Sequence, residues 1–217
     1  MVDYPTARRR MVDNQLRTSN VTDRRILAAM EEVPRERFLP DARRALAYVD
    51  AAHDLGGGRF LAAPAPFARL LQLAEVEDSD SVLDVGAGSG YTVAVLARLA
   101  GQVTGIESDA GLVAQANGLL GELGVANASV VQGQLDGAGQ RRDSFDVVMV
   151  EGAVAEVDDT LFGLLKDGGR LVALVSRNGA SVAHVFVKSG DKVTARAEFN
   201  TAMPPLVAGA REVQFQF

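Results

Sequence analysis

The chain has 217 residues, which suits one full-sized domain, or one domain with a small appendage. Hydrophobic residues make up 47% of the chain and charged residues 23%, a composition that excludes wholesale disorder. The net charge of −6 argues against a general binder of nucleic acid, because such proteins carry an excess of lysine and arginine.

Cysteine is absent, which excludes disulfides, thiolate metal sites and cysteine nucleophiles and is compatible with a reducing cytosol. The two histidines, His53 and His184, are far apart and have no metal-ligand spacing, so we expect no metal site. Residues 1–30 are too polar for a signal peptide, and no stretch approaches the ~18 apolar residues of a membrane span. We therefore expect a cytoplasmic protein without a membrane segment.

Residues 1–74 are predicted to form a helical N-terminal extension. A polar helix is expected over 6–20, and a second helix begins at Thr22 or Asp23, either of which can cap its free N–H groups. This second helix ends before Pro34, since the residue before a proline disfavours the helical conformation. The apolar face of this helix is formed by Ile26, Leu27 and Met30. The segments predicted after it are a short helical stretch at 34–50, a Gly- and Pro-rich loop at 55–66, and a helix at 67–76.

Residues 75–217 are predicted to form an α/β core. Short β-rich runs alternate with helical stretches, which is typical of a parallel sheet covered on both faces. Beyond residue 181 a hairpin is expected, with its turn at Ser189-Gly190-Asp191, and 211–217 is predicted to be a closing strand. The strands are expected at 81–86, 102–107, 128–133, 145–152 and 169–175, and the helices at 91–100, 111–123 and 158–168. A wound sheet that finishes with an antiparallel hairpin favours the Rossmann-like class I methyltransferase fold, by analogy, over ordinary dinucleotide folds.

A glycine-rich turn follows the first predicted strand of the core, in the segment VLDVGAGSGY at 82–91. Gly86, Gly88 and Gly90 allow the backbone to turn tightly and to approach a ligand without side-chain obstruction. A dinucleotide fingerprint would require glycine where Tyr91 stands. The spacing favours S-adenosylmethionine, which needs close backbone but no pyrophosphate cradle; a purely structural turn is the alternative.

An acid ends the next predicted strand, about 20 residues after the glycines, as a ribose-binding carboxylate would. Glu107 can accept two charge-assisted hydrogen bonds from a ribose diol at this place. A solvated acid at a strand end is the alternative.

The N-terminal half resembles a known family. The stretch MVDNQLRTSNVTDRRILAAMEEVPRERFLP at 11–40, followed by LAY and Asp50, is similar to the protein-L-isoaspartate O-methyltransferase family. The similarity continues through VLDVGAGSGYTVAVLARL, FDVVMV, LKDGGRLV and MPPL at 203–206, and so covers almost the whole chain. The resemblance implies transfer of the methyl group of S-adenosylmethionine to the free carboxylate of an isoaspartyl residue in damaged protein. A carboxylate is ionised at neutral pH, so such an enzyme needs no general base but must align the reactants and hold the carboxylate.

This sequence departs from the family in the substrate loop. The family loop carries a threonine and a serine where this chain has Phe60 and Ala62, so both hydroxyl donors are absent. The loss of one donor to a buried charged oxygen costs about 2–4 kcal/mol of transition-state stabilisation. Arg59, in the same loop, is either a solvated charge or a bidentate donor to the acceptor carboxylate, which makes it the candidate catalytic residue.

Two departures concern the cofactor pocket. Gln134 replaces an aspartate that would accept a hydrogen bond from the adenine amino group, so weakened binding is expected. Glu151, where bacterial members have threonine, would repel a carboxylate acceptor unless it is an exposed acid at a strand end. The candidate cofactor-binding residues are therefore Asp84, Gly86, Ala87, Gly88, Gly90, Glu107, Ser108, Gln134 and Glu151.

Three functions remain open from the sequence. The first is an S-adenosylmethionine-dependent methyltransferase acting on isoaspartyl residues or on a shifted peptide or protein acceptor. The second is a non-catalytic family member that keeps the cofactor as a binding module. The third, a nicotinamide-dependent oxidoreductase, is disfavoured by Tyr91 and the terminal hairpin. We expect no nucleic-acid or membrane partner, and a monomer.

Overall fold

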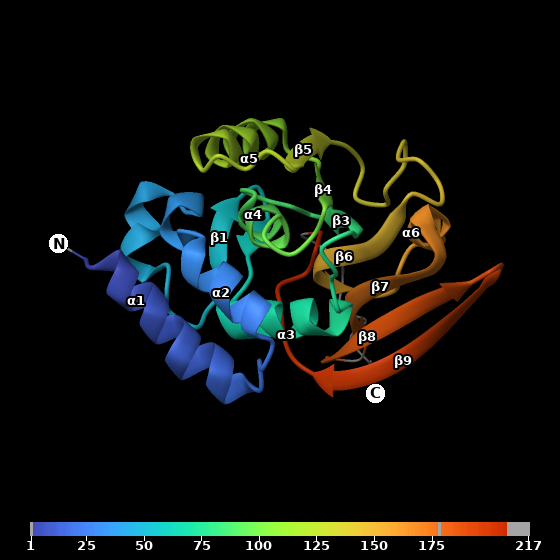
Figure 1. The fold of residues 1–217 in the computed structure, drawn as a ribbon, viewed down its shortest axis with the longest axis horizontal. Helices are drawn as coiled ribbons and strands as arrows, with labels where there is room; N and C mark the ends of the chain where they lie inside the picture. The colour runs from blue at the N-terminus through green and yellow to red at the C-terminus, as the bar shows by residue number, and fades with distance from the viewer. Residues whose placement is uncertain (1, 178, 208–217) are drawn as a thin grey trace, which may run out of the picture.

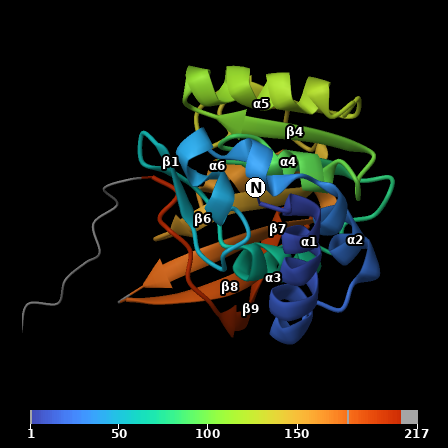
Figure 2. The ribbon, with the colours of Figure 1, turned by 90° about the vertical axis from the view of Figure 1, so that its left-hand side faces the viewer.

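The computed structural model describes residues 2–177 and 179–207, which are arranged around one large sheet. The sheet has seven strands in the order β5-β4-β3-β6-β7-β8-β9 (Figures 1 and 2). The strands are β3 (Ser81–Val85), β4 (Gln102–Glu107), β5 (Ala128–Gln132), β6 (Phe145–Val154), β7 (Leu165–Arg177), β8 (Ala180–Ser189) and β9 (Lys192–Asn200). The strands from β3 to β7 pair in parallel, and β8 and β9 pair antiparallel. The predicted fold class is thereby confirmed.

The chain order places a crevice at the carboxyl end of β3. From β3 the chain winds outward to β4 and β5, then returns to the other side of β3 to form β6 and β7. Ligands of open α/β sheets bind beyond the carboxyl ends of the strands at such a switch point.

Alternation along the strands divides the core into two layers. Val82, Val147 and Met149 belong to a cluster on the face covered by α2 (Arg24–Glu32), α3 (Pro64–Ala74), α4 (Tyr91–Leu96) and α5 (Ala110–Glu122). Leu83 and Val148, one residue further along, belong to a second cluster with α6 (Asp159–Leu164). Successive side chains of a strand point to opposite faces, so both faces of this sheet are apolar and covered.

The N-terminal helices lie where the sequence predicts them, but the first one, predicted to be polar, buries apolar side chains. Helical structure begins with α1 (Tyr4–Met11), and a π-helical turn at Val12–Leu16 and a 3₁₀ turn at Arg17–Ser19 continue it. The predicted polar helix nevertheless buries its apolar residues Met11, Val12 and Leu16 against the core. Asp23 rather than Thr22 caps α2, because its carboxylate accepts from the backbone N–H groups at positions 25 and 26.

The predicted loop at 55–66 is wrong. It contains a short antiparallel hairpin, formed by β1 (His53–Gly56) and β2 (Arg59–Leu61), and its last residues begin α3 at Pro64. The cluster of glycine and proline that predicted a loop instead provides a tight turn, with positive φ at Gly57 and Gly58, and a proline at the first helical position. This hairpin forms a separate two-stranded sheet.

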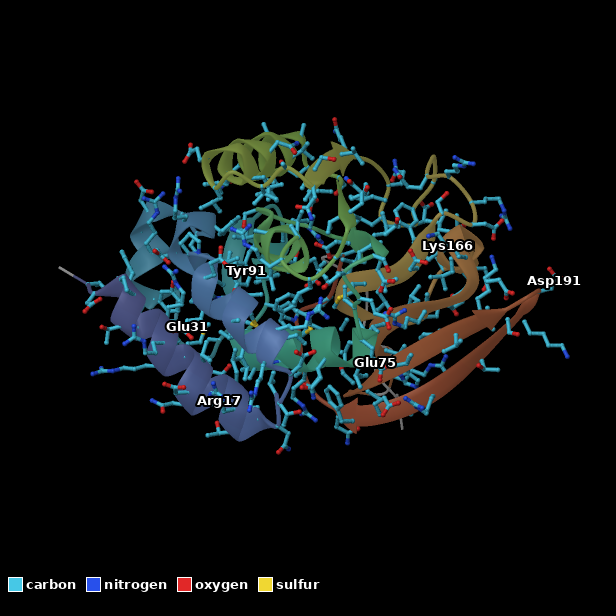
Figure 3. All side chains as sticks on the ribbon, viewed as in Figure 1. Arg17, Glu31, Glu75, Tyr91, Lys166 and Asp191 are labelled. Carbon is cyan, nitrogen blue, oxygen red and sulfur yellow. The ribbon has the colours of Figure 1, made fainter. Side chains whose placement is uncertain are left out.

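The C-terminal hairpin is as predicted, with Asp191 at its tip (Figure 3). It extends the β7 edge of the sheet, because β7 pairs with β8 and β8 with β9. The chain then returns across the sheet, where Pro205 forms a parallel bridge with Ala153 at the end of β6. The predicted strand at 211–217 lies outside the described residues. Among the helices that the structure describes, none is long and apolar enough to cross a bilayer.

Candidate active site

The glycine turn lies at the carboxyl end of β3, as the sequence predicts. The N–H groups of Gly86 and Ala87 both donate to the carbonyl of Ile106 on β4, at 2.9 and 3.0 Å. Gly86 has a φ of 89°, and a Cβ there would lie 2.6 Å from Arg59 Nη2. The turn therefore needs glycine both for its conformation and for the closeness of the side chains above it.

The helix after the turn is short, and its first side chain points inward. Gly90, with a φ of 90°, precedes α4, whose first residue is Tyr91. The ring of Tyr91 is fully buried among the N-terminal helices (Figure 3), and the guanidinium of Arg35 lies 4.9 Å from its centroid. Tyr91 thus connects the turn to the N-terminal segment.

Glu107 ends β4 beside the turn and is fully buried. Its Oε2 accepts from Gly88 N at 2.9 Å and from Arg59 Nε at 3.0 Å. Its Oε1 accepts from Ser108 N at 2.7 Å, from Ser108 Oγ at 3.2 Å and from Asp109 N at 3.1 Å. The reading of Glu107 as a solvated acid is therefore wrong. Both of its oxygens already have donors, so the ribose-binding role stays a prediction.

Arg59 is a partner of Glu107 that the sequence did not predict. It is only 7% exposed and forms an ion pair with Glu107, so the reading of Arg59 as a solvated loop charge is wrong. Its Nη1 donates to the carbonyl of Leu206, whose own N–H donates to Ala153 O at 2.9 Å. The guanidinium is thus held between the end of β4 and the returning C-terminal segment.

A pair of carboxyl groups lies next to Arg59. Asp84 is fully buried, and its Oδ2 accepts from the hydroxyl of Thr92. Its Oδ1 and the Oε1 of Glu151 are enclosed without a hydrogen-bond donor among the described residues, although Glu151 is partly exposed as a residue. Such an arrangement favours a proton shared by the two carboxyls.

Burial is the main cause of the unusual titration of this pair. It raises the pKa of Asp84 to about 6, while the hydrogen bond from Thr92 acts in the opposite direction. Burial and the neighbouring Asp84 together raise the pKa of Glu151 well above its usual value. Because two close carboxylates repel each other, the pair titrates as a unit.

The remaining predicted residues lie at the same edge of the sheet. Ser108 donates two hydrogen bonds to Glu107, from its N–H and from its hydroxyl. Gln134 is exposed just beyond β5, and its backbone carbonyl accepts from Gly137 N at 3.0 Å. The structure thus brings the turn, Asp84, Glu107 and Glu151 together with Arg59, whereas the adenine-binding role of Gln134 stays a prediction.

Arg35 and Leu206 belong to the site, although the sequence assigned them no role. Arg35 is fully buried, and it donates to Ala47 O at 2.8 Å and to Ala62 O at 2.5 Å, which fixes the substrate loop. Leu206 packs over Gly86, and its carbonyl holds Arg59. Both lie in segments that carried the family resemblance, PRERFLP and MPPL, but nothing in their patterns indicated what they would contact.

The acceptor side is a small cavity. It is lined by Arg59, Phe60, Ala62, Glu151, Gly152, Met203, Pro204 and Pro205, and its volume is about 10 Å³. Small-molecule sites usually measure ~300–1,000 Å³, so this one must open to admit an acceptor side chain. The turn and Glu107 fit S-adenosylmethionine in their chemistry, provided that Arg59 moves away from Glu107. Within the described ranges, no group of His, Asp and Glu side chains could hold a metal ion.

Comparisons with known proteins point to one family. A family model described as protein-L-isoaspartate(D-aspartate) O-methyltransferase matches residues 6–211. Protein-L-isoaspartate O-methyltransferase 2 of Anaeromyxobacter sp. (strain Fw109-5) is 41% identical over 77% of this chain and 69% of its own. Protein-L-isoaspartate O-methyltransferase of Aliivibrio fischeri (strain MJ11) is 33% identical over 94% of this chain and 97% of its own.

Solved structures agree in fold. A protein-L-isoaspartate O-methyltransferase superimposes with a TM-score of 0.79 at 25% identity, over 91% of this chain and 65% of the other. A protein described as a putative protein-L-isoaspartate O-methyltransferase from Plasmodium falciparum, in complex with S-adenosyl-L-homocysteine, gives a TM-score of 0.78. It is 19% identical over 92% of this chain and 97% of its own, so it supports the fold alone.

Proposed function

Because the chain belongs to the protein-L-isoaspartate O-methyltransferase family, we propose that it methylates the free carboxylate of isoaspartyl residues in proteins, with S-adenosylmethionine as donor. The observation that carries the proposal is the contact between the glycine turn and the acid, in which Gly88 N donates to Glu107 Oε2 at 2.9 Å. This contact supports the proposal, because the carboxylate that would accept from a sugar hydroxyl lies beside the glycine turn.

The cofactor supplies, when bound, a methyl group on a positively charged sulfur. The turn at Gly86–Gly90 carries no side chains of its own that would keep the cofactor from its backbone, and Glu107 holds the ribose hydroxyls once Arg59 has moved away from both. Ser108 and Asp109 orient Glu107 through their N–H groups. The protein's contribution is to align the acceptor oxygen with the methyl carbon and to exclude water, since the acceptor is already ionised.

The acceptor carboxylate is held from the cavity beside β2. With Phe60 and Ala62 in place of hydroxyl residues, Arg59 is the nearest strong donor, and its planar guanidinium can hold a carboxylate by two hydrogen bonds. Glu151 lines the same cavity. Its raised pKa favours the neutral form, and this reduces the repulsion that an ionised glutamate would exert on the acceptor.

Transfer of radiolabelled methyl groups tests the proposal. The purified protein is incubated with labelled S-adenosylmethionine and an isoaspartyl peptide, and the same peptide with ordinary aspartate is the matched control. We expect base-labile methyl esters on the isoaspartyl peptide alone, with inhibition by S-adenosylhomocysteine. Bound cofactor without any ester, at saturating peptide, would refute the proposed activity.

The acceptor is a peptide or protein rather than a nucleic acid, and the enzyme acts as a cytoplasmic monomer. The acidic net charge of −6 supports the exclusion of nucleic acid, since it disfavours a polyanionic partner. Light scattering after size exclusion is expected to give the mass of one 22.9 kDa chain.

A further inference from the structure

The guanidinium of Arg59 lies where the proposed ligand would meet the protein. Its Nε is 3.0 Å from Glu107 Oε2, and a Cβ on Gly86 would lie 2.6 Å from its Nη2. Arg59 therefore occupies the carboxylate, and together with Leu206, whose Cδ1 would lie 2.5 Å from the same Cβ, it covers the backbone of the turn.

A ribose and Arg59 cannot both hold Glu107 in this arrangement. Oε2 has two donors and Oε1 has three, which leaves neither oxygen free for a diol. Of these five donors, four come from the backbone and hydroxyl groups of the turn and of the loop after β4. Only Arg59 lies on a separate element that can withdraw.

We infer that Arg59 is an internal competitor for the ribose-binding carboxylate, and that its release from Glu107 delivers it to the acceptor cavity. The inference rests on the proposed function, and it makes binding ordered: the nucleoside first, the acceptor carboxylate second. Arg59 thereby acts as a positioning residue on one side of the site and as a substrate-binding residue on the other.

The construction of the hairpin is compatible with this movement. β1 and β2 pair with each other but not with the seven-stranded sheet, and Gly56, Gly57 and Gly58 connect them with positive φ. Arg59 already lines the acceptor cavity together with Phe60. The exchange that we infer takes the guanidinium from Glu107 toward that cavity by a change of side-chain rotamer with a small shift of the hairpin.

Charge favours the exchange. Arg59 lies close enough to Asp84 and Glu151 to lower the pKa of both carboxyls, and it neutralises Glu107. Its departure leaves a surplus of acid, which the ammonium group of S-adenosylmethionine or of S-adenosylhomocysteine can offset, and in S-adenosylmethionine the sulfonium as well. A buried charge pair is costly to break without such a replacement.

Arg59 is therefore expected to weaken nucleoside binding. If the guanidinium holds Glu107 for more than about nine-tenths of the time, the apparent affinity is reduced by about tenfold or more. Removing the guanidinium removes this competition. Glu107 remains hydrogen-bonded by Gly88, Ser108 and Asp109, so the variant does not leave a buried carboxylate without partners.

Calorimetric titration with S-adenosylhomocysteine is the first test, because it requires no catalysis. We expect Arg59→Gln to bind at least tenfold more tightly than the unmodified protein, and Arg59→Lys, which keeps the charge, to lie between them. Arg8→Gln is the matched control, because Arg8 forms a similarly buried pair with Glu36, 3.3 Å apart and outside the site. This control is expected to lose stability without a change in affinity. Thermal unfolding of each variant shows that it is folded.

Binding of a fluorescent isoaspartyl peptide tests the second half. In the unmodified protein, saturating S-adenosylhomocysteine is expected to tighten peptide binding at least tenfold, and in Arg59→Gln this coupling is lost. Equal or weaker nucleoside affinity in Arg59→Gln, or coupling that survives in it, overturns the inference while leaving the proposed function intact. Binding of the nucleoside and peptide as inferred, but without methyl transfer, refutes the function alone. No nucleoside binding by either protein overturns both.

Discussion

The paired carboxyl groups of Asp84 and Glu151 are expected to make the stability of the folded protein depend on pH. The pKa of Asp84 is raised from 3.8 to about 6, so between these values the folded protein holds a proton that the unfolded chain releases. The contribution of Asp84 to stability is therefore fully present below pH 3.8 and is lost as the pH rises through about 6. A tenfold difference in proton affinity between the folded and unfolded states corresponds to about 1.4 kcal/mol of stability.

Glu151→Gln is expected to remove the loss of stability that ionisation of the two carboxyl groups causes at high pH. The amide can donate to the Oδ1 of Asp84, which has no donor among the described residues, and the repulsion between the two acids disappears. We expect the free energy of unfolding at pH 8 to rise by about 1–3 kcal/mol, with a smaller gain at pH 4.5. Urea denaturation at both pH values measures the difference, and Glu156→Gln, at an exposed position, is the control. An identical gain at both pH values would contradict the shared proton.

The missing hydroxyls of the substrate loop make a second prediction at the scale of single residues. Phe60→Thr with Ala62→Ser restores the family's donors next to the acceptor cavity. We expect kcat/KM for an isoaspartyl peptide to rise by about 10–10³-fold, since a donor to a developing charge is worth a few kcal/mol. Ala63→Ser, which places a hydroxyl next to Ala62 but outside the lining of the acceptor cavity, is the control. Unchanged kcat/KM would mean that Arg59 has fully replaced the lost donors.

At the scale of elements, the turn between β3 and α4 can be tested through Gly90. It has a φ of 90°, and a Cβ there would lie 2.8 Å from the Cβ of Ala116 on α5. Gly90→Ala therefore imposes backbone strain and forces α4 and α5 apart. We expect the free energy of unfolding to fall by about 2–4 kcal/mol.

Gly121→Ala is the matched control for this substitution. Gly121 lies within α5, and a Cβ there meets nothing within 4 Å. Alanine in such a helical position is expected to stabilise the protein by about 0.5–1 kcal/mol. Chemical denaturation compares the two variants. Equal effects would show that the turn does not depend on its glycine.

Elements with a strong local pattern were predictable from the sequence, and those defined by distant contacts were not. The parallel strands, the Asp23 cap and the β8–β9 hairpin follow from hydrophobic runs, capping chemistry and turn residues. The β1–β2 hairpin was missed because its two strands are short and are interrupted by three glycines. In the site, the locations of the glycine turn and of Glu107 could be predicted, because the turn follows one predicted strand and Glu107 ends the next. The Arg59–Glu107 pair joins residues 48 positions apart, which no local pattern encodes.

At the scale of the whole molecule, the N-terminal helices and the sheet share one apolar cluster. Met30 of α2, Leu70 of α3 and Val147 of β6 all belong to it, as does Met203 near the C-terminal end of the described chain. Arg25 of α2 also donates to the carbonyls of Val76 and Leu99, at 2.8 and 2.7 Å. The division at residue 74 stays a prediction about sequence, but the two parts have no separate cores in the described structure.

We therefore expect the protein to unfold in one cooperative transition. Met30→Ala, at a fully buried position, is expected to lower the free energy of unfolding by about 2–5 kcal/mol, because it leaves a cavity in the shared cluster. Hydrogen exchange is the decisive measurement, since a cooperative unit transmits this loss to the amides of β3 and β6 as fully as to those of α2. If only α2 lost protection while the strands kept theirs, the N-terminal segment would be an independent unit. The substrate loop, which Arg35 holds from that segment, could then open without unfolding of the sheet.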